Sequence, residues 1–112
     1  MTVPKPGDIL QLYLTISDKA ISAVLIKEEN RIQKPIYYVS HALGASELIY
    51  SRIEKVALAL YQASIKLRPY FEAHVIMVFT NVPLKKVMDG DFGGRMSQWA
   101  VRLFSYDIRF EP

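Results

Sequence analysis

Residues 74–84, HVIMVFTNVPL, combine a short apolar run with a polar step and a proline. The run is short and rich in β-branched residues, so it predicts a strand, and its near-continuous apolar character predicts burial on both faces. Asn81 follows directly, and proline is common in the first turn of a helix. The stretch therefore predicts a strand ending near Thr80 and a short helix over 82–88, starting near Pro83 and capped by Asn81.

A long amphipathic helix is predicted before this strand, within residues 45–71, ASELIYSRIEKVALALYQASIKLRPYF. Ser46 is predicted as its N-cap, with Glu47 in the first turn, and Pro69 as the residue that ends it. Apolar and small side chains recur at helical spacing along one face, and polar ones occupy much of the rest. The face predicted to be buried consists of Ile49, Ile53, Val56, Ala57, Leu60, Ser64 and Leu67.

Three strands are predicted ahead of this helix. The alternation in ILQLYLTI, residues 9–16, indicates the first strand. ISAVLIK, residues 21–27, follows after a turn too short for a crossover, so the second strand must run antiparallel to the first. EENRIQK, residues 28–34, is predicted as a polar hairpin loop, and PIYYVSH, residues 35–41, as the third strand of a meander.

The remaining segments complete the predicted order β-β-β-α-β-α-α-β. RMSQWAVRLFS, residues 95–105, indicates a second amphipathic helix, and YDIRFE, residues 106–111, a closing strand. Because strands that follow helices lie parallel to their sheet neighbours through right-handed crossovers, we predict an α/β fold. Its mixed five-stranded sheet would combine a three-strand antiparallel meander with two parallel strands. Residues 1–8 are predicted as an N-terminal linker and residues 9–112 as one domain.

The composition narrows the classes of function. The chain has 112 residues and no cysteine, which excludes disulfides, thiolate chemistry and cysteine-ligated zinc. His41 and His74 are too few for a histidine-rich metal site. No apolar run approaches the length of a membrane span and the start lacks a secretory signal, so we expect an intracellular protein, cytoplasmic or nuclear, without a membrane partner. The formal charge of +3 is compatible with a polyanionic partner but does not require one.

Several segments, in order, resemble one family. They are LYLTISDKAISAVLIKEENRIQKPIYYVSHAL, YSRIEKVALALYQASIKLRPYF, FTNVPL and WAVRLFSYDIRFEP. Together they resemble the ribonuclease H-like domain of retrotransposon polyproteins, and more narrowly the Ty3/gypsy-type domain of plant elements that follows the reverse transcriptase. The resemblance covers the chain from about Leu10 to Pro112 and implies a ribonuclease H-like fold.

The resemblance also implies a metal site in active members. They use four carboxylates to hold two Mg²⁺ ions around the scissile phosphate of an RNA strand paired to DNA. Two dications about 4 Å apart repel each other, so several anionic oxygen ligands are needed to bind the pair. In this chain the first position, counted back from SAVL, falls on Thr15. The second, in YSRIEKVALA, falls on Val56, and the third, in FTNVPL, falls on Asn81.

These departures predict that the metal site is missing. Threonine, valine and asparagine replace three carboxylates, and valine offers no oxygen at all. Glu54 lies about 200° around the helix from Val56, so it is predicted to face away from the sheet. The fourth family position lies on a helix beyond the last strand, and this chain ends at Pro112 before it. We therefore expect no catalytic residues, no metal and no cofactor, with Mg²⁺ bound only if the domain is active after all.

Basic residues are the candidates for a nucleic-acid contact, because each phosphate that they neutralise releases counterions. The alternative is an ordinary charged helix surface, and the sequence does not decide between the two. The predicted contact residues are Arg52, Lys55, Lys85 and Lys86, with Lys66 and Arg68 as further basic neighbours.

Three functions follow from the resemblance. The leading hypothesis is a non-catalytic connection or tether module of a retrotransposon reverse transcriptase polyprotein. Its partners would be the polymerase domain and a downstream nuclease of the same polyprotein, in a virus-like particle or the nucleus, with an RNA/DNA hybrid as a further candidate. The alternatives are an active RNA–DNA hybrid ribonuclease H and a protein-interaction domain derived from a retroelement.

Overall fold

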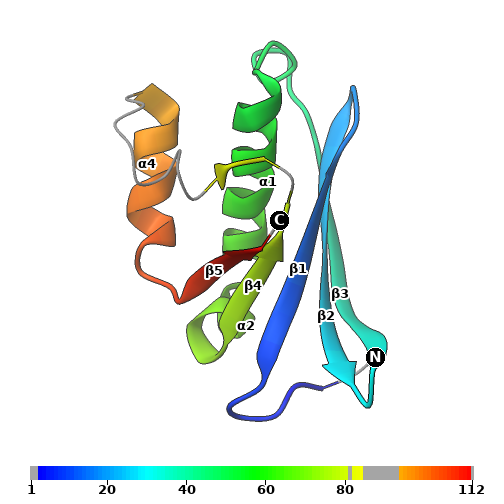
Figure 1. The fold of residues 1–112 in the computed structure, drawn as a ribbon. Helices are drawn as coiled ribbons and strands as arrows, with labels where there is room; N and C mark the ends of the chain where they lie inside the picture. The colour runs from blue at the N-terminus through cyan, green and yellow to red at the C-terminus, as the bar shows by residue number, and fades with distance from the viewer. Residues whose placement is uncertain (1–2, 81, 85–93, 112) are drawn as a thin grey trace.

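The computed structural model describes residues 3–80, 82–84 and 94–111, and for residues 94 and 95 it describes the backbone only (Figure 1). The predicted helix over 82–88 therefore lies largely outside the described residues. The elements run in the order β1 Ile9–Ile16, β2 Ala20–Glu29, β3 Ile32–Ala42, α1 Arg52–Lys66, α2 Arg68–Ala73, β4 Val75–Phe79, α4 Gly94–Leu103 and β5 Ile108–Glu111.

The strands form one mixed sheet in the order β3-β2-β1-β4-β5. β1, β2 and β3 pair antiparallel, as their short connections require. β4 and β5 lie parallel to β1 and to each other, because helices separate them in the chain. The predicted α/β sheet, a three-strand meander joined to two parallel strands, is confirmed.

The core lies between this sheet and helix α1. Leu10 and Leu12 of β1 are fully buried, whereas Thr15 on the opposite face of the strand is exposed. α1 lies across the buried face, and α4 packs beside α1 (Figure 1). The aromatic ring of Trp99 on α4 sits 5.8 Å from that of Tyr61 on α1, so α4 is joined to the same core. No helix in the described ranges is both long and apolar enough to cross a membrane.

The β2–β3 hairpin is tighter than predicted. The strands continue to Glu29 and resume at Ile32, so the loop predicted over 28–34 shrinks to Asn30 and Arg31. Both have positive φ, 55° and 64°, which matches a two-residue turn that follows the twist of the strands. Asparagine tolerates this conformation, so Asn30 was the residue in the sequence that could have indicated the turn. The polar residues around it belong to the strand ends.

The predicted start of the long helix is wrong. α1 begins at Arg52, and Ser51 is its N-cap. The Ser51 hydroxyl accepts from the Glu54 N–H, and the Glu54 carboxylate accepts from the Ser51 N–H, which is a capping box. Ser46 lies in a turn, and Glu47 Oε1 accepts from the Gly44 N–H at 2.8 Å. Ser46 lacks a glutamate three residues later, which was the distinguishing signal.

The helix also ends differently. α1 stops at Lys66, and Leu67 adopts a non-helical conformation between α1 and the short helix α2. Pro69 lies in the first turn of α2 instead of simply ending a helix, because the N–H groups of a first turn have no partner within the helix anyway. The change of direction places Phe71, 1% exposed, in the core.

The buried face of α1 was predicted correctly over most of its length. Ile49 is the exception: it is 83% exposed, because it precedes the helix. Burial also extends beyond the predicted face, since α4 covers a second side of α1. The buried residues of α1 are Val56, Ala57, Leu58, Ala59, Leu60, Ala63 and Ser64.

β4 differs from its predicted burial on both faces. Ile76 and Val78 are fully buried on the side of α1. Val75, Met77 and Phe79 are only half-buried on the other side. An apolar run therefore indicated the strand but not the number of layers that cover it.

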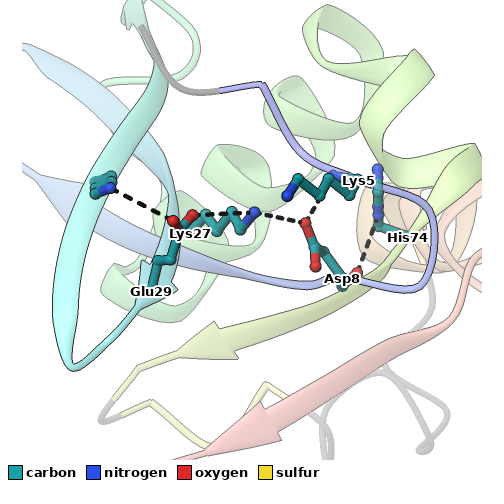
Figure 2. Close-up of polar contacts among 6 residues, drawn as sticks. Lys5, Asp8, Lys27, Glu29 and His74 are labelled. Atoms are coloured by element: carbon teal, nitrogen blue, oxygen red, sulfur yellow. Dashed lines mark hydrogen bonds and ion pairs between the residues drawn. The ribbon is translucent and has the colours of Figure 1, made fainter.

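The segment before β1 is fixed to the sheet by charge. Figure 2 shows Lys27 of β2 between two carboxylates, with its ammonium 2.9 Å from Asp8 Oδ2 and 3.3 Å from Glu29 Oε2. The same Asp8 oxygen accepts from the backbone N–H of Lys5, and the Asp8 carbonyl lies 3.0 Å from His74 Nδ1. Lys27 is only 7% exposed, so these partners compensate a largely buried charge. Whether residues 1–8 form a linker stays a prediction.

Asp8→Asn is expected to lower the thermal midpoint at neutral pH. The midpoint of this variant should also decrease less than that of the wild type as the pH is lowered. The Lys5 N–H, and next the Lys27 ammonium, hold the pKa of Asp8 below its ordinary value of 3.8. A depressed carboxyl pKa adds stability that is complete above the unfolded-state pKa and is lost as the pH falls through the folded-state pKa. Circular dichroism melts from neutral pH down through the ordinary carboxyl pKa of 3.8 follow this loss.

Asp18→Asn is the matched control, because Asp18 lies in an exposed turn and makes no ion pair within the described ranges. Equal acid sensitivity of the Asp8→Asn variant and the wild type would show that Asp8 does not anchor the segment.

Candidate functional site

A pocket of about 420 Å³ opens at the carboxyl ends of β1 and β4. These strands are adjacent and parallel, with Tyr13 paired to Phe79, so their ends meet at one edge of the sheet, as in other α/β ligand sites. The first residues of α1 close one side. The pocket is lined by Tyr13, Leu14, Thr15, Ile16, Arg52, Val56, Phe79, Thr80 and Val82.

The structure brings two of the three predicted family positions together here. Thr15 and Val56, distant in sequence, line the same pocket. Asn81 lies outside the described residues, but Thr80 and Val82 on either side of it are also lining residues. The location predicted from the strand ends therefore agrees with the pocket.

Thr15 and Val56 also have ordinary structural roles. The Thr15 hydroxyl lies 2.8 Å from the Ser22 hydroxyl on β2, and either can donate. Val56 is 5% exposed and belongs to the hydrophobic core. Neither side chain carries a charge, so neither can supply an anionic metal ligand.

Thr80 was not singled out from the sequence. Its hydroxyl accepts from the Val82 N–H at 3.1 Å, and its N–H donates to the Glu111 carbonyl of β5 at 3.1 Å. A hydroxyl that accepts one hydrogen bond still has a proton to donate. A threonine directly after a strand is the only sequence signal of this role, and many strands end in this way.

Two aromatic rings, one from β1 and one from β4, form one wall of the pocket. The rings of Tyr13 and Phe79 stack, with centroids 4.9 Å apart and an interplanar angle of 9°. The Gln33 side-chain amide on β3 donates to the Tyr13 hydroxyl at 2.9 Å, which fixes the ring. Both residues are half-buried, on the face of the sheet opposite α1. Tyr13 and Thr15 lie on the same face of β1, because alternate residues of a strand share a face.

Arg52 sets the electrostatic character of the pocket. It is exposed, it is the first residue of α1, and among the lining residues given above it is the only charged one. It forms no ion pair with any carboxylate in the described ranges. The described lining of the pocket therefore carries a positive charge, whereas the family resemblance implies several negative charges at this place.

The other predicted basic residues that the structure describes do not join Arg52. Lys55 is half-buried on α1 and is not a lining residue of the pocket. The Lys66 ammonium donates to the Ser40 carbonyl at 2.9 Å, and Arg68 pairs with Glu72. Lys85 and Lys86 lie outside the described residues.

The residues present do not fit a pair of Mg²⁺ ions. The described lining of the pocket offers a guanidinium, hydroxyls and apolar side chains, and it contains no carboxylate. Mg²⁺ binds through carboxylates with water or phosphate oxygens, and a nearby cation opposes it. Glu54, the nearest alternative, is held in the capping box with Ser51. Across the described ranges, no group of three or more histidine, aspartate or glutamate side chains could hold a metal ion.

Related proteins share this fold. The Retrovirus-related Pol polyprotein from transposon opus of Drosophila melanogaster is 33% identical in an alignment of 94 residues that covers 81% of this chain and 9% of that protein. A foamy viral protease–reverse transcriptase in complex with double-stranded DNA matches with a TM-score of 0.75 at 22% identity, over 96% of this chain and 24% of the other. The same enzyme with an RNA/DNA hybrid matches with a TM-score of 0.69 at 23% identity, over 92% and 15% of the two chains.

The chain thus spans only a small part of each of these relatives. The family described as "RNase H-like domain found in reverse transcriptase" matches residues 5–106, nearly the whole chain. The strand order and the position of the pocket agree with the fold that the sequence resemblance implied. This chain belongs to the family of RNase H-like domains found in reverse transcriptases.

Proposed function

We propose that this domain of a retroelement polyprotein, of Ty3/gypsy type, does not hydrolyse RNA itself. It acts as a connection between the polymerase domain and a downstream nuclease of the same polyprotein, and it supports the handling of the template–primer duplex. The observation that carries this proposal is the pocket beside Thr15 and Val56, whose described lining contains Arg52 and no carboxylate.

The physical argument is electrostatic. Hydrolysis by two metal ions requires ligands that neutralise most of the charge of two dications. Thr15 and Val56 cannot do this, and the Arg52 guanidinium adds a positive charge in the same pocket. A domain that keeps the scaffold but lacks these ligands can still hold a duplex or a neighbouring domain.

The proposed partners follow from the relatives. One solved relative is a protease–reverse transcriptase in complex with double-stranded DNA, and another structure holds an RNA/DNA hybrid. Each matched chain is several times longer than this one, which agrees with a module placed among other domains. By analogy, we assign a duplex and the adjacent polymerase as the partners of this domain.

A nuclease assay tests the proposal. The purified chain is incubated with a labelled RNA/DNA hybrid in Mg²⁺ and, separately, in Mn²⁺, beside an active ribonuclease H. No cleavage above the buffer control is expected. Cleavage that co-elutes with the chain and disappears in the Glu54→Gln variant, which removes the carboxylate nearest in sequence to Val56, would contradict it.

A protein contact is the second candidate function. Val101, in the last turn of α4, and Phe104, just after this helix, are 74% and 63% exposed and offer apolar surface to a partner. A stable dimer together with no salt-dependent affinity for duplexes would favour this function over duplex handling.

A further inference from the structure

We propose that the pocket at the carboxyl ends of β1 and β4 binds a phosphodiester of a nucleic-acid strand directly through Arg52, without a metal ion. This inference rests on the proposed function and deepens it. It assigns to the pocket a ligand of opposite charge to the cations of active relatives.

The charge of the pocket is the first argument. Arg52 lines a concave site and has no carboxylate partner within the described ranges, unlike Arg68, which pairs with Glu72. A guanidinium presents several N–H donors in a planar fork that matches two oxygens of a phosphate. Mg²⁺ in the same place would meet that positive charge, and the described lining residues include no anionic ligand to compensate it. The pocket therefore favours an oxyanion over a cation.

The hydroxyl groups are the second argument. The Thr80 hydroxyl accepts from the Val82 N–H and keeps its own proton for a further acceptor. The hydrogen bond between the Thr15 and Ser22 hydroxyls uses one of their two protons, so the pair can donate the other proton to a ligand. Threonine and serine hydroxyls are common partners of phosphate and sugar oxygens. They add neutral donors around the single charge of Arg52.

The aromatic wall points to a nucleic-acid strand rather than to free phosphate. The stacked rings of Tyr13 and Phe79 offer an ordered apolar surface beside the polar groups, and Gln33 fixes the Tyr13 ring. Sugars and bases pack against such rings with little dependence on sequence. A pocket of about 420 Å³ is also larger than an inorganic anion needs and falls in the usual range for small-ligand sites.

The position of Arg52 is fixed by the fold. It directly follows Ser51, whose capping box with Glu54 defines the start of α1. Val56, one turn further on, packs into the core and holds this end of the helix over the strand ends. The backbone that carries the Arg52 side chain is therefore already ordered, which reduces the entropy lost when a phosphate binds.

Fluorescence anisotropy tests the inference. The chain is titrated against a labelled RNA/DNA hybrid and a DNA duplex of the same sequence, at several salt concentrations, in EDTA and in Mg²⁺. The wild type is expected to bind in EDTA. Arg52→Gln is expected to weaken binding about tenfold, since a hydrogen bond to a charged group is lost, and to reduce the salt slope by about 1. Arg52→Lys should restore part of the affinity as a point charge.

Arg31→Gln is the matched control. Arg31 is an exposed arginine at the β2–β3 turn, at the opposite end of the sheet from the pocket, and its replacement should leave affinity unchanged. Thr15→Val keeps the β-branched shape, removes the hydroxyl, and should weaken binding by about twofold to fivefold. Inorganic phosphate at equal ionic strength should compete only weakly. Melts by circular dichroism confirm that every variant is folded.

The outcomes separate the two proposals. Equal affinity of the wild type and Arg52→Gln, binding that requires Mg²⁺, or no binding by the wild type would each overturn this inference and leave the non-catalytic assignment standing. Equal losses in Arg52→Gln and Arg31→Gln would also overturn it, because they would indicate a diffuse charge effect. Cleavage of the hybrid would remove the proposed function, whatever the result for Arg52.

Discussion

Leu60→Ala is expected to lower the free energy of unfolding by about 3 kcal/mol, within the range of about 2–5 kcal/mol for such core truncations. Leu60 is fully buried near the middle of α1, within the cluster that joins the sheet to α1 and α4. The truncation removes buried apolar surface and leaves a cavity that rigid strands cannot close. Small domains have a total stability of about 5–15 kcal/mol, so the variant loses a large share of it.

Urea unfolding followed by circular dichroism measures this effect. Val101→Ala is the control, because it also truncates a branched side chain in a helix but at a position 74% exposed. Its effect should stay within about 0.5 kcal/mol. Similar losses in the two variants would mean that the packing of α1 against the sheet is not the main source of stability.

Much of the fold could be predicted because its signals are local and repeated. The alternation from Ile9 to Ile16 identified the first strand, and this strand is confirmed. The spacing of Val56, Ala57 and Leu60 identified the face of the helix that packs on the sheet. Each signal rests on several residues, so one exception does not obscure it.

The predicted helix boundaries were wrong where a single residue determines them. Ser46 and Ser51 are both acceptable N-caps, and only the reciprocal bond with Glu54 distinguishes the second. Pro69 can end one helix or begin another, and the choice depends on how Phe71 reaches the core. Such alternatives differ by about 1 kcal/mol locally, so tertiary packing decides between them.

The position of the candidate site could be predicted from the sequence, but the charged residue that lines it could not. The strand order and the family resemblance led to Thr15 and Val56, which line one pocket. Arg52 was grouped with other basic residues, because sequence does not show which of them enters a concave site. Lys66 and Arg68 had the same charge and are engaged elsewhere.

Restoring acidic residues should create a metal response that the wild type lacks. The variant Thr15→Asp/Val56→Glu/Asn81→Asp places carboxylates at the three family positions. Without divalent ions it should melt below the wild type, because Val56 is only 5% exposed and the new charges repel one another. Mg²⁺ or Mn²⁺ should then raise its midpoint with the logarithm of the metal concentration above the Kd, and the added stability should be about 2.7 kcal/mol at a concentration 100 times the Kd.

Differential scanning calorimetry with increasing Mg²⁺, compared with Na⁺ at equal ionic strength, separates specific binding from screening. Thr15→Asn/Val56→Gln is the control, since it adds similar shapes without charge and should show no metal dependence. The wild type should also show none, because the described lining of its pocket consists of Arg52 and neutral side chains. A Mg²⁺ stabilisation of the wild type that Na⁺ at equal ionic strength does not reproduce would contradict the proposal that the domain is non-catalytic. Its absence in the triple variant would instead mean that these three positions do not converge, because carboxylates brought together around one pocket must respond to a dication.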